Sequence, residues 1–276
     1  MRIKFFKMSG AGNDFVLVGG GRFAAARLKK LAVRLCSRGT GVGADGLLWV
    51  QKKSPAHIAV RYFNRDGSEA FCGNGSRCAA WWAFRRGLVK RGSFMLSTAA
   101  GELPVRVTGD EKVKMRMPAV RPVSLRHKGR YPKKVGEAHF LDTGVPHAVI
   151  PVKDLRSVDV AGLGRLLRNN RAFGPAGANV DFVSLKRGVL NIRTYERGVE
   201  AETSACGTGV AAAAVAMGLL HGLPSPVPVG VWSGARFRVW FKPGPACSAA
   251  EIYLEGPARI VFEGVIEISG AVKSKA

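Results

Sequence analysis

Apolar and polar residues alternate along most of this chain with the two-residue period of a β-strand. Glycine and proline, 35 and 14 residues, separate the alternating segments and supply their turns. The pattern predicts a strand-rich protein. The predicted strands are residues 3–6, 14–18, 47–51, 57–63, 94–97, 102–107, 113–117, 139–142, 148–151, 180–186, 190–195, 229–232, 237–241, 252–254 and 259–268.

Helical periodicity is confined to a few segments between these strands. Residues 23–37 place leucines on one face and basic side chains on the other, which predicts an amphipathic helix. Residues 209–220 are apolar throughout, and glycine and proline directly after them end the helix. Further helices are predicted at residues 76–86 and 160–169.

The order of these elements repeats. Residues 58–64 form a strand that ends in a polar residue, then come a glycine turn, the phrase Cys72-Gly73-Asn74-Gly75 and a helix. Residues 190–196 lead in the same way to Cys206-Gly207-Thr208-Gly209 and a helix. A strand, a turn, a cysteine phrase and a helix in the same register indicate an internal duplication.

The duplication predicts two domains, and 276 residues suffice for both. Residues 118–134 are basic, contain prolines and are weakly patterned, so we expect the connection between the domains there. The predicted domains are residues 1–120 and 121–263.

The net charge is +24, which invites a nucleic-acid-binding interpretation. The basic residues are scattered, however, and aromatic residues are not interleaved with them for base stacking. A solvated basic surface is therefore the favoured interpretation. We find neither an apolar run of membrane-spanning length nor a signal peptide, so we expect a cytoplasmic protein with reduced thiols.

Five cysteines is an odd number, and no pair has the Cys-x-x-Cys spacing of a zinc site, so no metal site is predicted. Cys36, Cys78 and Cys247 are expected to be buried, small apolar side chains. Cys72 and Cys206 each open a predicted helix.

A helix N-terminus carries unpaired N–H groups and a positive dipole end. Such a position lowers the pKa of a thiol and can also hold a carboxylate, so Cys72 and Cys206 are the candidate catalytic residues. A thiolate on one side of a carbon could remove a proton while a thiol on the other side donates one. A single cysteine of this kind could equally be a buried residue at the start of a helix, but the duplicated pair favours chemistry.

The chain resembles the diaminopimelate epimerases, a family of pyridoxal-phosphate-independent amino-acid epimerases. The motifs that carry the resemblance occur in the family's order over nearly the whole chain. They are residues 7–15, 43–46, 64–69, 72–75, 146–147, Asn179, 195–198 and 206–209.

This resemblance implies an α/β (α+β) fold of two pseudo-symmetric domains. Each domain would be a curled, mostly antiparallel sheet or barrel around a central helix, with the active site in the cleft between them. The last strand, near residues 264–268, would return to the first domain, so that residues 264–276 belong to it.

The activity implied is the interconversion of LL- and meso-diaminopimelate in lysine and peptidoglycan precursor biosynthesis, without a cofactor, by a homodimer. Cys72 and Cys206 would be the acid/base thiols, and His147 and Glu196 would modulate their pKa values. The residues implied to bind the substrate are Asn13, Asn64, Gly73, Asn74, Asn179, Glu196, Arg197, Gly207 and Thr208.

Plainer roles stay open for several of these residues. Asn13, Asn64 and Asn179 lie beside or near glycines and could be turn formers. His147 follows a proline and could be an ordinary loop residue. Glu196 and Arg197 could form a surface ion pair.

Two substitutions depart from the family pattern. Some relatives carry glutamine where Gly46 stands, and some carry asparagine where Val145 stands. In addition, the spacing before Cys72 is one residue short, and residues 199–202 are correspondingly longer. The alternatives are therefore a same-fold racemase of another amino acid, such as proline or hydroxyproline, and a basic nucleic-acid-binding protein on this fold.

Overall fold

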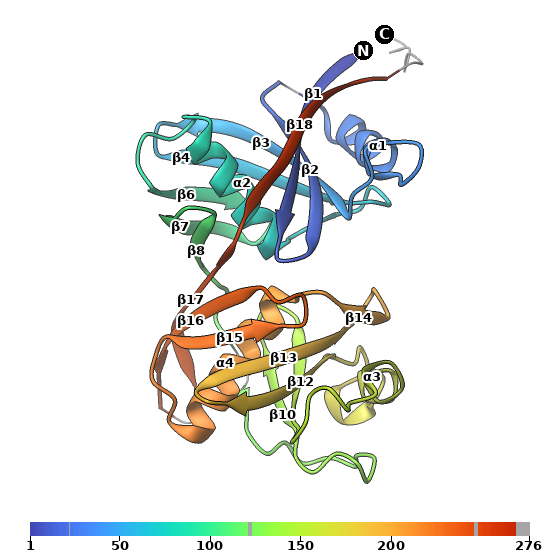
Figure 1. Ribbon diagram of the computed structural model, residues 1–276, viewed down its shortest axis with the longest axis vertical. Helices are drawn as coiled ribbons and strands as arrows, with labels where there is room; N and C mark the ends of the chain where they lie inside the picture. Colours follow the sequence, from blue (N-terminus) through green and yellow to red (C-terminus); the bar gives the residue numbers. More distant parts are fainter. Residues whose placement is uncertain (22, 121–122, 246–247, 269–276) are drawn as a thin grey trace. The chain divides into compact units, whose positions relative to one another are not determined.

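The computed structural model describes residues 1–21, 23–120, 123–245 and 248–268. It divides into two compact units (Figure 1). Unit 1 consists of Met1–Val113 with Ala258–Ala276, of which the structure describes residues up to 268, and unit 2 is Lys114–Pro257.

Unit 1 is a curled sheet with one helix against each face. The neighbouring strands pair antiparallel, except for the parallel pairs β2–β3 and β4–β6. Its strands are β1 (Arg2–Gly10), β2 (Asn13–Gly19), β3 (Gly46–Ser54), β4 (His57–Asn64), β5 (Glu69–Ala70), β6 (Ser93–Thr98), β7 (Gly101–Gly109), the start of β8 (Lys112–Arg116) and β18 (Arg259–Glu267). Its helices are α1 (Ala25–Cys36) and α2 (Gly73–Arg85).

Helix α2 is the centre of unit 1. It contacts β1, β2, β3, β4, β6, β7 and β18, so the sheet curls around it. All its residues from Asn74 to Ala83 are buried. The amphipathic α1 covers the outer face of the sheet, where its leucines pack against Val16, Leu47 and Phe63.

Unit 2 has the same construction. The pairs β11–β12 and β13–β15 are parallel, and the other described pairs are antiparallel. Its strands are β9 (Val123–Ser124), β10 (His139–Asp142), β11 (Pro146–Pro151), β12 (Asn179–Lys186), β13 (Val189–Glu196), β14 (Ala201–Thr203), β15 (Val227–Val231), β16 (Arg236–Pro243), β17 (Ala249–Pro257) and the end of β8. Its helices are α3 (Val160–Arg168), a short 3₁₀ turn (Arg171–Phe173) and α4 (Gly207–His221).

Helix α4 takes the central place in unit 2. Every residue from Gly209 to Gly218 is buried, and the helix contacts β10, β11, β12, β13, β15, β16 and β17. A helix that is apolar on all sides has no solvent-facing stripe, so this enclosure follows from its sequence. Helix α3 packs on the outer face through Val160 and Leu167, which lie against Phe182 and Tyr195.

The duplication predicted from the sequence is confirmed by the order of the elements. In unit 1 the chain runs β2, α1, β3, β4, β5, α2, β6, β7, and in unit 2 it runs β11, α3, β12, β13, β14, α4, β15, β16. The last strand returns to unit 1, where β18, dark red in Figure 1, pairs antiparallel with β1. This strand begins at Arg259, earlier than the resemblance implied.

The division between the units lies elsewhere than the composition suggested. It falls between Val113 and Lys114, inside β8, whereas residues 118–134 belong to unit 2. Val113, Met115 and Met117 are all buried, so the alternating pattern of a strand continues along β8. In the part of the chain that the structure describes, no helix is long and apolar enough to cross a membrane.

Candidate active site

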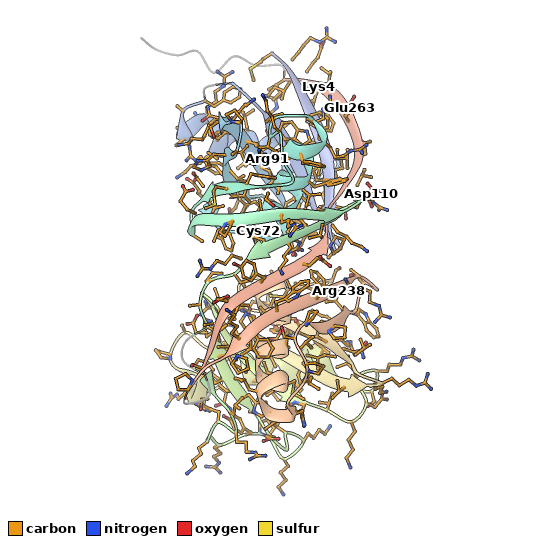
Figure 2. The ribbon with its side chains drawn as sticks, turned by 90° about the vertical axis from the view of Figure 1, so that its left-hand side faces the viewer. Lys4, Cys72, Arg91, Asp110, Arg238 and Glu263 are labelled. Atoms are coloured by element: carbon orange, nitrogen blue, oxygen red, sulfur yellow. The ribbon has the colours of Figure 1, made fainter. Side chains whose placement is uncertain are left out.

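Cys72 lies at the N-cap of α2, the central helix of unit 1 (Figure 2). Its backbone is extended, with φ −137° and ψ 111°, because the chain arrives there from β5 and turns into the helix. The Gly75 backbone N–H donates to Cys72 Sγ at 3.4 Å. The sulfur therefore occupies the position of a helix-capping acceptor, as the sequence predicted.

Asn13 and Asn74 come together beside this helix end. Asn74 lies in the first turn of α2 and is 5% exposed, while Asn13 begins β2. The Asn74 Nδ2 group donates to Asn13 Oδ1 at 2.6 Å. The structure thus joins two of the predicted site residues, and Gly73 is the first residue of the same helix.

Asn64 has a local role at the end of β4. Its Nδ2 group donates to Ser68 Oγ at 2.9 Å, and its backbone carbonyl accepts from Gly67 N–H at 2.9 Å. The side chain therefore stabilises the turn between β4 and β5. Its contact with a substrate stays a prediction.

Cys206 is the counterpart of Cys72 in unit 2, at the N-cap of α4. It is 7% exposed, and its Sγ is 3.3 Å from Thr208 Oγ1, within a hydrogen bond. Burial raises the pKa of this thiol well above its ordinary value of 9.0, and the charges of Glu196 and Asp181 raise it further. These effects outweigh the hydrogen bonds from the Thr208 side chain and the Gly209 backbone, which lower the pKa.

The prediction that the helix end lowers the thiol pKa is thus wrong for Cys206. Desolvation disfavours a buried thiolate, and two nearby carboxylates disfavour it again. The influence of the helix terminus is smaller than these effects combined. These surroundings therefore favour the protonated thiol form of Cys206.

Asp181 is the residue that the sequence reasoning missed. It is completely buried in β12, where its two carboxylate oxygens accept from His147 Nδ1 and from Thr194 Oγ1, both at 2.7 Å. A Cβ atom on Gly209 would collide with the same carboxylate, so Asp181 lies directly against the first turn of α4. A carboxylate among the apolar residues of a predicted strand is costly unless it is paired, and that was the available signal.

His147 is not a loop residue. It lies in β11, is fully buried, and is the register partner of Asn179 in β12. With Nδ1 held by Asp181, its Nε2 atom is left facing Asn179 Nδ2 at 3.5 Å. The hydrogen bond between His147 and Asp181 thus fixes the orientation of the imidazole ring beside α4, the helix that Cys206 caps.

Asn179 also holds the chain after β13. Its Oδ1 accepts from the Arg197 backbone N–H at 2.8 Å, and its Nδ2 donates to Pro146 O at 3.4 Å. Glu196, the last residue of β13, is the carboxylate that acts on Cys206 from the other strand. Glu196 thus raises the pKa of the Cys206 thiol, and its role as a pKa-modulating residue in catalysis stays a prediction.

The remaining described cysteines have no such surroundings. Cys36 and Cys78 are fully buried, and burial raises the pKa of each thiol to about 12. They are apolar core residues, as predicted. Cys247 lies outside the described residues.

A cavity of about 610 Å³ lies elsewhere in unit 2. It is lined by the loop after β11, the ends of β12 and β13, and Trp232. None of the predicted site residues lines it. Ser184, one of its lining residues, has a buried hydroxyl without a hydrogen-bond partner among the described residues.

Comparison with known proteins decides the family. The diaminopimelate epimerase family model matches residues 5–123 and 139–261. A diaminopimelate epimerase from Chlorobaculum tepidum is 40% identical over 95% of this chain and 100% of its own length. The chain belongs to the diaminopimelate epimerase family. A relative of the same name from Aquifex aeolicus is 37% identical over 95% of this chain and 97% of its own length.

Solved structures with the same fold are more distant in sequence. A PhzF-family phenazine biosynthesis protein from Bacillus anthracis has a TM-score of 0.77 at 19% identity, covering 97% of this chain and 100% of its own. A probable proline racemase from Agrobacterium radiobacter has a TM-score of 0.72 at 18% identity, covering 99% and 94%. These similarities show the fold alone, and they confirm the predicted fold class.

Gly46, where some members of the family carry glutamine, is explained by its neighbour. A Cβ atom at this position would collide with the Tyr62 ring and would lie 2.6 Å from the Phe63 carbonyl oxygen. Tyr62, packed edge-on against Phe15 at 5.9 Å, occupies the space that a side chain at position 46 would need. The Tyr62 ring can therefore take this position only because residue 46 has no side chain.

Val145, the other departure, contributes only its backbone to the described hydrogen bonds. Its carbonyl accepts from the Thr143 N–H at 3.1 Å, within the tight turn that joins β10 to β11. An isopropyl side chain can neither donate nor accept a hydrogen bond. Any contact that an asparagine makes at this position in relatives is absent here.

Replacing Asp181 with asparagine tests the electrostatics of Cys206. Asp181→Asn removes one of the negative charges that raise the pKa of Cys206, so the pKa should fall and the thiolate fraction at a given pH should rise. The alkylation rate of Cys206 against pH, measured by mass spectrometry of its peptide, should have its midpoint above 9.0 in the parent protein and a lower midpoint in the variant. The exposed Asp154→Asn is the matched control, and an unchanged or higher midpoint in Asp181→Asn would contradict the interpretation.

Adding a side chain at Gly46 tests its pairing with Tyr62. Gly46→Ala should lower the free energy of unfolding by about 1–3 kcal/mol, the usual effect of overpacking. Tyr62→Ala should relieve part of that loss, which denaturant unfolding of both single variants and the double variant would measure as a coupling energy. Gly136→Ala is the control, because nothing lies within 4 Å of its added Cβ. Strictly additive effects of Gly46→Ala and Tyr62→Ala would show that the two positions are independent.

Proposed function

We propose that this protein interconverts LL- and meso-diaminopimelate by proton transfer between Cys72, Cys206 and the substrate α-carbon. The observation that carries this proposal is the equivalent placement of the two sulfurs, each at the N-cap of the buried central helix of its unit. A purely structural role would not require a thiol at both equivalent positions. The curated relatives, which carry the name diaminopimelate epimerase, support the choice of substrate.

The proposed step is a balanced exchange of protons. A thiolate takes the α-proton from one face of the carbon, the C–H electron pair stays on the carbon, and a thiol delivers a proton to the opposite face. The donor becomes the thiolate and the acceptor becomes the thiol, so nothing is oxidised or reduced. The raised pKa of Cys206 makes it the proton donor in the first turnover.

The substrate carries a carboxylate and an ammonium group at each of its two ends, so both donors and acceptors are needed. The N-termini of α2 and α4 supply backbone N–H groups at Gly73, Asn74, Gly207 and Thr208 for a carboxylate. The amides of Asn13, Asn64 and Asn179 can each donate and accept. Glu196 and Arg197 supply the charged partners.

His147 contributes to the proposed site through its buried hydrogen bond to Asp181. Held by that carboxylate, its imidazole presents a fixed edge toward Asn179, whose other contacts order the backbone of Arg197. We propose that the hydrogen-bonded residues His147, Asp181 and Asn179 orient the substrate-binding residues of unit 2 relative to Cys206.

We also propose a cytoplasmic location for this protein. A cytoplasmic location suits a mechanism that requires two reduced thiols. The homodimer implied by the family resemblance stays a prediction.

Solvent-hydrogen exchange provides the decisive test. In D₂O, the reduced protein without added pyridoxal phosphate should incorporate deuterium at the α-carbon of LL- or meso-diaminopimelate, measured by mass spectrometry. Cys72→Ala and Cys206→Ala should each abolish interconversion, whereas Cys36→Ala should retain it. Full activity in either of the first two variants would exclude the two-thiol mechanism.

The rival substrate class is tested in the same assay. A hydroxyproline epimerase from Agrobacterium vitis shares the fold with a TM-score of 0.70 but only 18% identity. A panel that includes proline and hydroxyproline should show exchange only with diaminopimelate. Exchange with proline and none with diaminopimelate would replace the proposed substrate, and salt-dependent RNA binding without epimerisation would favour the nucleic-acid alternative.

A further inference from the structure

We propose that Arg77 and Asp45 are positioning residues that set the amide orientation of Asn74 and Asn13 through one hydrogen-bonded relay in unit 1. The inference rests on the proposed function, because it concerns two residues assigned there to substrate binding. It adds Arg77 and Asp45, which have no role in that assignment.

The relay is continuous from the core to the surface. Arg77 Nη2 donates to Asn74 Oδ1 at 2.6 Å, and Asn74 Nδ2 donates to Asn13 Oδ1 at 2.6 Å. Asn13 Nδ2 then donates to Asp45 Oδ2 at 3.1 Å. Every bond thus runs in the same direction, from the guanidinium to the carboxylate.

The two ends determine this direction. A guanidinium can only donate hydrogen bonds, and an ionised carboxylate can only accept them. If the two amides turned round, N–H would face N–H at Arg77 and oxygen would face oxygen at Asp45. Burial lowers the pKa of Arg77 to about 10, so it is still a cation at neutral pH.

The core end of the relay is costly for the fold. Arg77 is completely buried in the first turns of α2, near the positive end of the helix dipole. Arg85 on the same helix is exposed, so the helix does not require a buried arginine in general. A buried cation at an unfavourable helix position is typical of a residue kept for function.

Other groups hold the surface end. Arg38 Nη2 donates to Asp45 Oδ1 at 2.9 Å, and the Asp14 backbone N–H donates to Asp45 Oδ2 at 3.2 Å. The carboxylate that ends the relay is therefore itself fixed by two donors. This matters because the Asp45 side chain is 40% exposed and would otherwise be free to rotate.

The relay decides what Asn13 offers to a ligand. With one N–H bonded to Asp45 and one lone pair bonded to Asn74, the amide has one N–H and one lone pair left, on defined edges. A reversed amide would exchange these edges and would turn its oxygen toward a substrate carboxylate. Orientation by Arg77 and Asp45 therefore affects substrate binding more than the proton-transfer step.

The test uses Asp45→Asn combined with two substitutions of Arg77. In Asp45→Asn, Arg38 and the Asp14 backbone N–H compete for the single oxygen of the new amide. The charged Arg38, at the shorter distance, is the stronger donor, so the new N–H turns toward Asn13 and favours the reversed relay. Arg77→Lys leaves a group that can only donate and so opposes the reversal. Arg77→Gln leaves a group that can do either and so permits it.

The effect on KM of the residue at position 77 should depend on whether residue 45 is aspartate or asparagine. With Asp45 intact, Arg77→Lys and Arg77→Gln should differ less than about twofold in KM for diaminopimelate, because the carboxylate alone still sets the direction. In the Asp45→Asn background, Arg77→Gln should give a KM about tenfold above that of Arg77→Lys, with kcat changed much less. Equal KM values for the two double variants would overturn the proposal. Asp110→Asn, at an exposed position labelled in Figure 2, is the control for loss of an acidic residue.

A second measurement does not depend on activity. In the Asp45→Asn background, the side-chain amide signals of Asn13 in ¹H–¹⁵N spectra should move between Arg77→Lys and Arg77→Gln, with those of the exposed Asn169 unchanged. Identical Asn13 signals in these two folded proteins would overturn the relay. If the parent protein does not epimerise diaminopimelate, the proposed function fails while these spectra still decide the relay. Should the proteins that carry Arg77→Gln not fold, Asp45→Asn alone must shift the Asn13 amide signals, because Arg77 still fixes the amide direction and the Asn13 N–H loses its carboxylate acceptor. Unshifted Asn13 signals in that variant would overturn the proposal.

Discussion

Enclosure of a central helix by a curled sheet is the constraint on which the rest of each unit depends. Helices α2 and α4 are buried along most of their length, so their ends must meet hydrogen-bonding groups supplied by the protein. At the N-terminus of each, the N-cap position is taken by a cysteine that arrives from a short edge strand. The sulfur of the proposed acid/base thiol is thus placed by the same geometry that completes the helix.

The two units share this geometry but differ in the charges buried beside it. In unit 1 a fully buried arginine, Arg77, lies in the second turn of the helix that Cys72 caps. Burial lowers the pKa of this guanidinium, while Cys78 and Cys72 raise it. In unit 2 the buried neighbours of Cys206 are the carboxylate of Asp181 and, from the end of β13, Glu196. The two equivalent thiols therefore lie in different electrostatic surroundings, which suits the proposed exchange of protons.

Sequence reasoning singled out the candidate site residues that belong to repeated or ordered motifs and missed the residues that hold them in place. Both cysteines, Asn13, Asn74 and Asn179 lie where the motifs suggested, and the structure adds their partners. Asp181 was missed because its role depends on burial next to the start of α4, which a distant segment forms. Arg77 was missed because strands from elsewhere in unit 1 enclose its helix and bury it. Tyr62 was missed because its relation to Gly46 is a steric contact across two paired strands.

The sequence by itself determined the alternating strands, the helices, one of them apolar on all sides, and the duplicated cysteine phrases, because periodicity and helix signals are local properties of the chain. It also placed both thiols at helix starts. Only the tertiary structure decided the pKa of Cys206, since burial and the charges of Glu196 and Asp181 are contributed by other strands and outweigh the local effect of the helix. The fold likewise decided the orientation of the Asn13 and Asn74 amides, because Arg77 and Asp45, whose charges set that orientation, meet them only after folding.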